Sequence, residues 1–260
     1  MSSQSAKAAA KAGVEIRELR EIGEFQQVYR LFDQIWHPDP RNAPVTVELM
    51  IGFAHTGNYV TGAFDGDTLV GASVGFLAAG RTLHSHVTGA VIGHGIGYAL
   101  KLHQRDWCRE RGLERITWTF DPLVRRNARF NLVKLGALPE AYLEEFYGPM
   151  ADAINEGDAS DRLLAVWRVA PGEGAGASPP ETEGLPVLLG SEDERPVVRG
   201  VLGEAVLVGT PRDIEELRRT DPAAAKEWRM AVRTVLGTLI GAGGQVVGFT
   251  DRGEYIVMVN

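Results

Sequence analysis

A glycine-rich turn constrains this chain more than any other feature, because of what flanks it. Residues 91–97 read Val-Ile-Gly-His-Gly-Ile-Gly, residues 82–88 before them alternate as a half-buried strand does, and a helical pattern follows. A glycine turn that opens a helix exposes backbone N–H groups at the positive end of the helix dipole, where a phosphate or pyrophosphate binds well. The sequence therefore predicts an anion site at Gly93, His94, Gly95, Ile96 and Gly97.

Two other glycine motifs do not fit this turn. A dinucleotide-binding turn reads Gly-x-Gly-x-x-Gly or Ala, but Tyr98 or Leu100 occupies its last position in the two registers. The chain also lacks the Gly-Lys-Ser/Thr of a nucleotide P-loop. The remaining alternative is a turn in which glycine only permits tight packing between a strand and a helix.

The segments around the turn predict an α+β fold. Asp65-Gly66-Asp67 lies between two alternating runs and predicts a hairpin, and Thr46 is placed to cap a helix. Up to residue 170 the expected order is β-α-α-β-β-β-α-β-α-β-β. The expected strands are 14–19, 59–64, 69–77, 82–88, 116–121, 143–147 and 163–169, and the expected helices are 21–36, 46–57, 96–111 and 125–135.

Composition shifts divide the chain into four parts. We expect a disordered tail at 1–13, a first domain at 14–170, a Gly/Pro-rich linker at 171–185, and a C-terminal α/β extension at 186–260 that packs on the first domain. The extension should hold strands at 187–189, 205–208, 246–250 and 255–259, with a helix from Asp213 to Ile240 that breaks at Asp221-Pro222.

Bulk composition narrows the class of protein. The 260 residues carry a formal net charge of -7 and no basic stripe, which argues against a nucleic-acid partner. A single cysteine, Cys108, excludes an intramolecular disulfide and a cysteine-based zinc knuckle. Because no signal-peptide core or bilayer-spanning apolar run occurs, we expect a cytoplasmic protein without a membrane partner, and a homodimer stays open.

The glycine turn, its helix and the sequence Lys-Leu-Gly-Ala at 134–137 together resemble the Gcn5-related N-acetyltransferase (GNAT) superfamily. Its signature is Arg/Gln-x-x-Gly-x-Gly/Ala, and Gly95-Ile96-Gly97 matches the second half. Residues 118–136, 147–150 and 160–163, and the tail from Thr210, resemble a narrower bacterial branch of the superfamily. The resemblance implies a mixed, mostly antiparallel twisted sheet flanked by helices.

The resemblance also implies an activity. The protein would be an acyl-CoA-dependent N-acyltransferase that moves an acetyl or succinyl-type group from acetyl-CoA or another acyl-CoA to a small amine, such as an amino acid. Two positions depart from the family pattern, since Ile92 stands in place of Arg or Gln, and Leu132 stands where many members carry a tyrosine acid. The alternative is therefore a catalytically altered protein of this fold that serves as a ligand-binding or interaction module.

Two histidines on the strand before the turn are the candidate catalytic residues. His84 and His86 alternate with Ser85, so we expect them on one strand face, together with Thr88. An imidazole is a suitable general base for an amine nucleophile, and in the superfamily this strand faces the acyl thioester. The alternative is that both histidines only bond to neighbours. A His-x-His metal site lacks a third ligand at close spacing, so we expect no metal.

The remaining candidates bind cofactor or substrate. Val87, which follows the histidines on the same strand, is a candidate cofactor-binding residue. Asn127 and Asn131 lie one helical turn apart, where the resemblance places the pantetheine arm. Asn127 could instead cap its helix. Trp118 and Arg229 are the candidate substrate residues, with Arg229 a clamp for a carboxylate or, alternatively, a surface ion-pair partner. Lys101 is expected on the solvated face of its helix.

Overall fold

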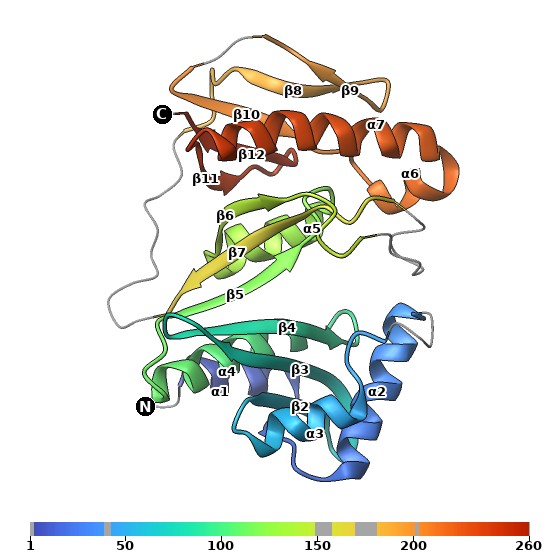
Figure 1. The fold of residues 1–260 in the computed structure, drawn as a ribbon, viewed down its shortest axis with the longest axis vertical. Coiled ribbons are helices and arrows are strands. Elements are labelled where there is room, and N and C mark those ends of the chain that lie inside the picture. Colours follow the sequence, from blue (N-terminus) through green and yellow to red (C-terminus); the bar gives the residue numbers. More distant parts are fainter. Residues whose placement is uncertain (1–2, 39–42, 149–157, 170–180, 201–202, 260) are drawn as a thin grey trace. The chain divides into compact units, whose positions relative to one another are not determined.

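The computed structural model describes residues 3–38, 43–148, 158–169, 181–200 and 203–259. The chain divides into two compact units, 1–117 with 169–172 and 118–168 with 173–260. The division falls inside strand β5 (Arg115–Phe120), which runs from the first unit into the second (Figure 1). The sequence placed the boundary near residue 170 instead. The expected linker lies largely outside the described residues.

The first unit contains a sheet with helices on both faces. Its strands follow the order β1-β2-β3-β4-β5, antiparallel from β1 to β4 and parallel between β4 and β5. This confirms the mixed, mostly antiparallel sheet. The elements before β5 are α1 (Gln4–Ala12), β1 (Glu15–Glu18), α2 (Ile22–Trp36), α3 (Val47–His55), β2 (Tyr59–Asp65), β3 (Thr68–Ala78), β4 (Thr82–Ala90) and α4 (Ile96–Glu110).

Local sequence signals set these elements. The Glu21 and Glu24 side chains form a capping box at the start of α2, and Thr46 Oγ1 accepts from the Leu49 amide at the start of α3. Gly66 has φ 56° in the β2–β3 turn, a conformation that glycine adopts without strain.

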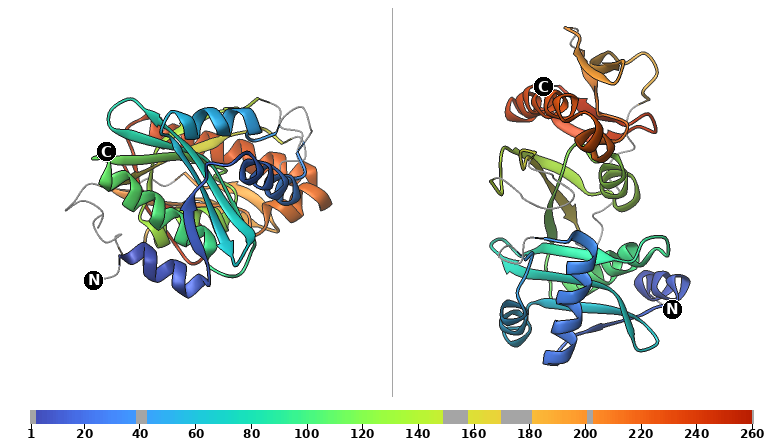
Figure 2. Two further views of the ribbon diagram at one scale, coloured as in Figure 1. Left: turned by 90° about the horizontal axis from the view of Figure 1, so that it is seen from below. Right: turned by 90° about the vertical axis from the view of Figure 1, so that its right-hand side faces the viewer.

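The two faces of the first sheet carry different helices. A side chain at Gly89 would meet Phe32 and Trp36 of α2, whereas one at Gly71 would meet Ile96 and Leu100 of α4. Helices α2 and α3 therefore cover one face, and α4 with α1 covers the other (Figure 2). One core cluster lies under α2 and α3 and includes Leu19, Phe25, Val28, Phe32 and Met50.

The segment expected to be a disordered tail forms helix α1. Ser3 caps it by accepting from the Ala6 amide, and Gly13 ends it with φ 69°. The helix packs on α4, where Arg105 donates to the Gln4 side chain at 3.0 Å. Composition alone did not reveal this packing partner.

The second unit joins the end of β5 to a second sheet. Strand β7 lies beside β5 and pairs antiparallel with β6, and the second sheet has the order β11-β12-β10-β8-β9. The elements are α5 (Arg125–Ala128), the π-helical η2 (Arg129–Leu135), β6 (Leu138–Leu143), β7 (Arg162–Arg168), β8 (Val187–Glu192), β9 (Arg195–Val198), β10 (Ala205–Gly209), α6 (Ile214–Thr220), α7 (Pro222–Val232), the π-helical η3 (Arg233–Gly237), α8 (Thr238–Gly241), β11 (Gln245–Phe249) and β12 (Glu254–Met258).

The second unit explains where the boundary falls. Strand β6 contacts β11, η3 and α8, and η2 contacts β11, so the chain before and after the expected linker shares one body. The helix break at Asp221-Pro222 is confirmed, because Asp221 caps α7 through the Ala224 amide. The strand expected at 143–147 is wrong: β6 ends at Leu143, and 144–147 form a turn. No helix in the described part of the chain is long and apolar enough to cross a membrane.

Candidate functional site

The glycine turn of the first unit is an open helix start. Gly95 is the N-cap of α4 with φ 76° and offers no capping side chain, and Gly93 has φ 107°. A side chain built at Gly93, Gly95 or Gly97 would meet no atom within 4 Å, so the space over the turn is clear. The first turn of α4 contains no acidic residue. An anion can therefore approach the amides of this turn without displacing a side chain or meeting a carboxylate there.

Ile92, next to this turn, is 93% exposed. A large apolar side chain in that setting brings no charge to an anion. The turn would therefore hold a phosphate by its amides and the helix dipole, while His94 is an exposed imidazole beside them.

Strand β4, which leads into the turn, contains a bulge at His86. Val74 of β3 pairs with Val87 and Gly75 pairs with Ser85, so His86 is the extra residue. Strand β5 pairs with Thr82 to His84 of β4 through Arg115 to Thr117. The bulge also resets the alternation. Thr88 bonds Ser73, which in turn bonds Gln104 of α4, so the expectation that Thr88 shares the histidine face is wrong.

His84 lies half-buried on β4 with one ring nitrogen engaged. Its Nδ1 is 3.1 Å from Thr117 Oγ1 on β5, and its ring lies 5.1 Å from that of Phe76. Burial lowers the pKa of His84 below the ordinary value, and His86 and Lys101 lower it further. The ring is therefore neutral at pH 7. When Nδ1–H donates to Thr117, Nε2 keeps a lone pair and can accept a proton.

His86 has a structural bond instead. Its Nε2–H donates to the Pro44 carbonyl at 2.8 Å, which ties the segment before α3 to the bulge. The Nδ1 atom of His86 then keeps a lone pair, as Nε2 of His84 does. The two histidines differ in the group that holds them, which is a backbone carbonyl for His86 and the Thr117 hydroxyl for His84.

Beneath β4, Lys101 of α4 is buried, so its expected place on a solvated face is wrong. Its Nζ donates to Ser85 Oγ at 2.9 Å and to Gln104 Oε1 at 3.4 Å, and Gln104 donates to Ser73. Burial lowers the pKa of Lys101 to about 7. The spacing carried a signal for this, because Lys101, Gln104 and Cys108 share one helix face and cysteine is usually buried.

In the second unit, two candidate residues bond to each other. Trp118 Nε1 donates to Asn131 Oδ1 at 3.2 Å, and both side chains are buried. Asn127 is half-buried on α5. Val124, rather than Asn127, is the N-cap of that helix, and it makes no side-chain cap, so the capping alternative is wrong.

Arg229 of α7 belongs to a buried charge cluster. Its guanidinium donates to both Asp121 oxygens at 2.9 Å and to Asp158 at 2.9 Å, and it is 1% exposed. Burial alone would raise the pKa of Asp121, but the charges and hydrogen bonds of Arg229, with the charge of Arg218, hold it well below its usual range. Sequence reasoning missed Asp121, Asp158 and Arg218, since nothing local links residues about a hundred positions apart.

Among the described residues, no group of three or more His, Cys, Asp or Glu side chains is arranged to hold a metal ion. The candidate chemistry of the first unit lies at the open turn, the bulged strand, and the His84 and His86 imidazoles.

Comparison with known proteins finds similarity in structure. No family model matches the sequence, and no curated protein matches it. A probable acetyltransferase from Staphylococcus epidermidis ATCC 12228 matches at TM-score 0.50 and 13% identity, over 60% of this chain and 98% of that one. Ard1 from Thermoplasma volcanium matches with a TM-score of 0.49 and 18% identity, over 60% of this chain and 98% of that one. An acetyltransferase of the GNAT family from Streptococcus pneumoniae matches with a TM-score of 0.46 and 16% identity, over 60% of this chain and 99% of that one. The first of these likenesses shows a shared fold.

Proposed function

From the shared acetyltransferase fold, we propose that this protein belongs to the GNAT superfamily and is an acyl-CoA-dependent N-acyltransferase acting on a small amine, such as an amino acid. The observation that carries the proposal is the open turn from Gly93 to Gly97 at the start of α4, directly after the bulged strand. Positive-φ glycines, a clear approach and a helix start without acids suit the pyrophosphate of coenzyme A.

The residues of the first unit fit the coenzyme. Amides of Gly93 to Gly97 would hold the phosphates, and the end of β4, including Val87, would offer backbone groups to the pantetheine arm. The coenzyme would supply an activated acyl thioester. Asn127 and Asn131 remain predicted pantetheine contacts, and Trp118 and Arg229 remain predicted substrate contacts.

His84 and His86 remain the predicted bases, since each keeps one ring nitrogen with a lone pair. The pKa of His84 lies below its ordinary value, so its ring is neutral near pH 7 and can accept the proton that the attacking amine releases. A backbone N–H at the His86 bulge, which the ladder pairing skips, would stabilise negative charge on the acyl oxygen. Leu132 is buried and has no acidic group, so the departing thiolate would take its proton from water.

Two assays test this proposal. Acetyl-CoA, succinyl-CoA and free CoA at millimolar concentration should each raise the melting temperature, since a ligand that binds only the folded chain stabilises it. Thiol release over a panel of amines should then show turnover that His84→Ala reduces by about 10²-fold or more. His86→Ala is measured beside it, and full turnover in either folded variant would remove that histidine from the mechanism. An absence of any thermal shift with all three coenzymes would refute the proposal.

The exposed Ile92 and the buried Leu132 favour one second candidate, a protein of this fold that binds a coenzyme or ligand without turning it over. Thermal stabilisation by CoA with no thiol release for any amine would support that alternative.

A further inference from the structure

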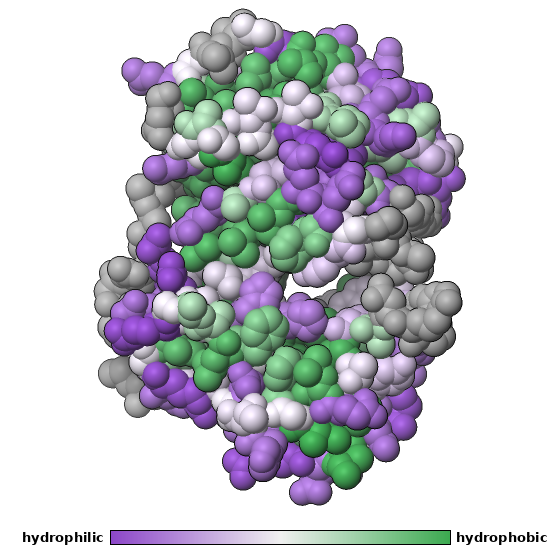
Figure 3. All heavy atoms as spheres, in the orientation of Figure 1, coloured by the Kyte–Doolittle hydropathy of each residue, from purple (hydrophilic) through white to green (hydrophobic). Residues whose placement is uncertain are grey.

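Hydrophilic side chains gather on the surface over α6 and α7 (Figure 3), but several polar side chains of the first unit are buried together between α4 and the sheet. Lys101 and Gln104 lie three residues apart on one face of α4 and are 5% and 0% exposed. Ser73 of β3 and Ser85 of β4 are 1% and 3% exposed. Because a buried polar group is costly unless it is hydrogen-bonded, these side chains need partners in the core.

A chain of hydrogen bonds joins them. Lys101 Nζ donates to Ser85 Oγ at 2.9 Å and to Gln104 Oε1 at 3.4 Å. Gln104 Nε2 donates to Ser73 Oγ at 3.3 Å, and Ser73 Oγ lies 2.7 Å from Thr88 Oγ1. We call these five residues the α4 network. It ties β4 to α4 at two points, Ser85 and Thr88.

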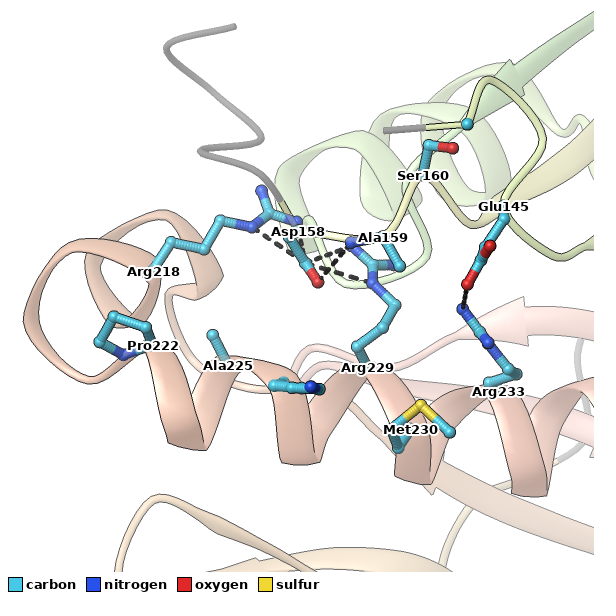
Figure 4. A pocket seen from close by; sticks show the side chains of 12 residues that line it. Glu145, Asp158, Ala159, Ser160, Arg218, Pro222, Ala225, Arg229, Met230 and Arg233 are labelled. Atoms are coloured by element: carbon cyan, nitrogen blue, oxygen red, sulfur yellow. Dashed lines mark hydrogen bonds and ion pairs between the residues drawn. The ribbon is translucent and has the colours of Figure 1, made fainter. Parts of the chain in front are cut away.

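The α4 network differs from the buried charges of the second unit. There, Arg229 donates to the carboxylate of Asp158, so opposite charges compensate each other (Figure 4). Lys101 donates to neutral hydroxyl and amide oxygens instead. Such hydrogen bonds depend on direction, and a buried network of them fixes where its members lie. The α4 network therefore determines the position of the β4 backbone.

The two points at which the network holds β4 require a bulge between them. Ser85 and Thr88 are three residues apart, and in a regular strand side chains at an odd separation point to opposite faces. Both hydroxyls nevertheless join the network on the α4 face. The extra residue His86 resets the alternation, so that Val74 pairs with Val87.

A regular register would place the wrong side chain on each face. A slip of one residue exchanges the two faces of a strand, so without the bulge Val87 would face α4 and Thr88 would face the core under α2 and α3. In the structure Val87 packs against that core. The slip would separate Thr88 from Ser73 and put a hydroxyl among apolar side chains, and both changes are costly. The buried polar groups thus select the bulged register.

We propose that Lys101 and Gln104 are positioning residues for acyl transfer, because the α4 network holds the β4 bulge at His86. The bulge presents the backbone N–H that would stabilise the acyl oxygen, and it sets the directions of the two candidate histidines. The role of the network in turnover rests on the acyltransferase proposal, whereas its role in placing the bulge does not.

Nuclear Overhauser effects (NOEs) between backbone protons of β3 and β4 test the placement of the bulge in the full chain without coenzyme. In the wild type, Val74 should show NOEs to Val87. The exchange variant, Val87→Thr with Thr88→Val, keeps the composition but lets a regular register turn the hydroxyl toward α4. Its Val74 NOEs should therefore move to His86.

Variants of α4 test the network itself. Gln104→Met keeps the side-chain length but removes the bonds to Lys101 and Ser73, so β4 should populate both registers and show a second set of β3–β4 NOEs. Gln104→Glu is the matched control, because its carboxylate can accept from Lys101 and from the Ser73 hydroxyl, and it should keep the single wild-type set. Lys101→Met should resemble Gln104→Met, whereas Lys11→Met, at an exposed position of α1, should leave the NOEs unchanged.

Thiol release connects the bulge to turnover. In folded protein, kcat should fall about tenfold or more in Gln104→Met and in the exchange variant, because the reacting groups lose their alignment, and Gln104→Glu should keep most of it. The wild-type NOEs alone in both the exchange variant and Gln104→Met would overturn the proposal, as would full turnover in a variant whose Val74 NOEs have moved to His86. If the wild type releases no thiol with any amine, the acyltransferase proposal fails, and the NOEs still decide whether the network places the bulge.

Discussion

Replacing Lys101 with methionine removes a charge from the core of the first unit while keeping a side chain of similar length. In the wild type the ammonium lies under β4, bonded to the neutral Ser85 and Gln104 side chains and close to Cys108 and His84. Burial of a charge is costly, so the folded chain favours the neutral amine.

The pKa of Lys101 fixes the sign and size of the effect. Burial lowers it from 10.5 to about 7. Between these values the unfolded chain keeps the proton that the folded chain has released, so the free energy of unfolding rises with pH. The stability that Lys101 contributes is complete above the pKa that it has in the unfolded chain. It is lost as the pH falls toward the pKa that it has in the folded chain. For a single group shifted this far, the rise between pH 7 and pH 9 is about 2 kcal/mol.

Urea denaturation at pH 7, 8 and 9 measures this rise, with hydrogen exchange of the α4 amides as a readout confined to the first unit. Lys101→Met should lack the rise of about 2 kcal/mol relative to wild type. Lys134→Met, at an exposed position, should keep the wild-type dependence. Taking the difference between variants cancels the other groups that titrate in this range. Parallel curves for wild type and Lys101→Met would refute the view that burial under β4 lowers the pKa of Lys101.

Three further substitutions follow from the structure. Gly95→Ala meets no atom within 4 Å but must hold φ 76°, so it should cost about 1–2 kcal/mol of stability by urea denaturation and should weaken coenzyme A binding in a calorimetric titration. Ile92→Arg should tighten coenzyme A binding several-fold at low salt, with the gain shrinking as salt rises, because a cation joins the amides of the turn. Asp121→Asn should destabilise by about 3–5 kcal/mol because it leaves Arg218 and Arg229 short of a carboxylate, whereas Asp251→Asn, in an exposed pair with Arg129, should cost under about 1 kcal/mol.

Much of the first unit follows from local sequence signals. The cap at Thr46, the Asp-Gly hairpin and the glycine helix start each depend on a few neighbouring residues, and the structure contains all three. No local sequence signal predicts the bulge at His86, because the bulge depends on the register in which β3 pairs with β4. As a result, the sequence grouped Thr88 with the histidines although its hydroxyl bonds Ser73 toward α4.

The second unit shows where local reasoning ends. The sequence predicts a strand at 143–147, but the Glu145 amide donates to Asp161 and the Tyr147 amide donates to Ser160, so the chain turns there. The Asp121–Arg229 pair joins positions 108 residues apart. Such contacts form only when the chain packs, so residue spacing and hydrophobic periodicity in the sequence do not predict them.

Amide hydrogen exchange of the full chain with and without coenzyme A tests whether the glycine turn is a coenzyme A cradle. We expect slower exchange at residues 93–99 when the coenzyme is bound, with much less protection in Gly95→Ala. Binding that leaves these amides unprotected, or protection confined to another part of the chain, would contradict it.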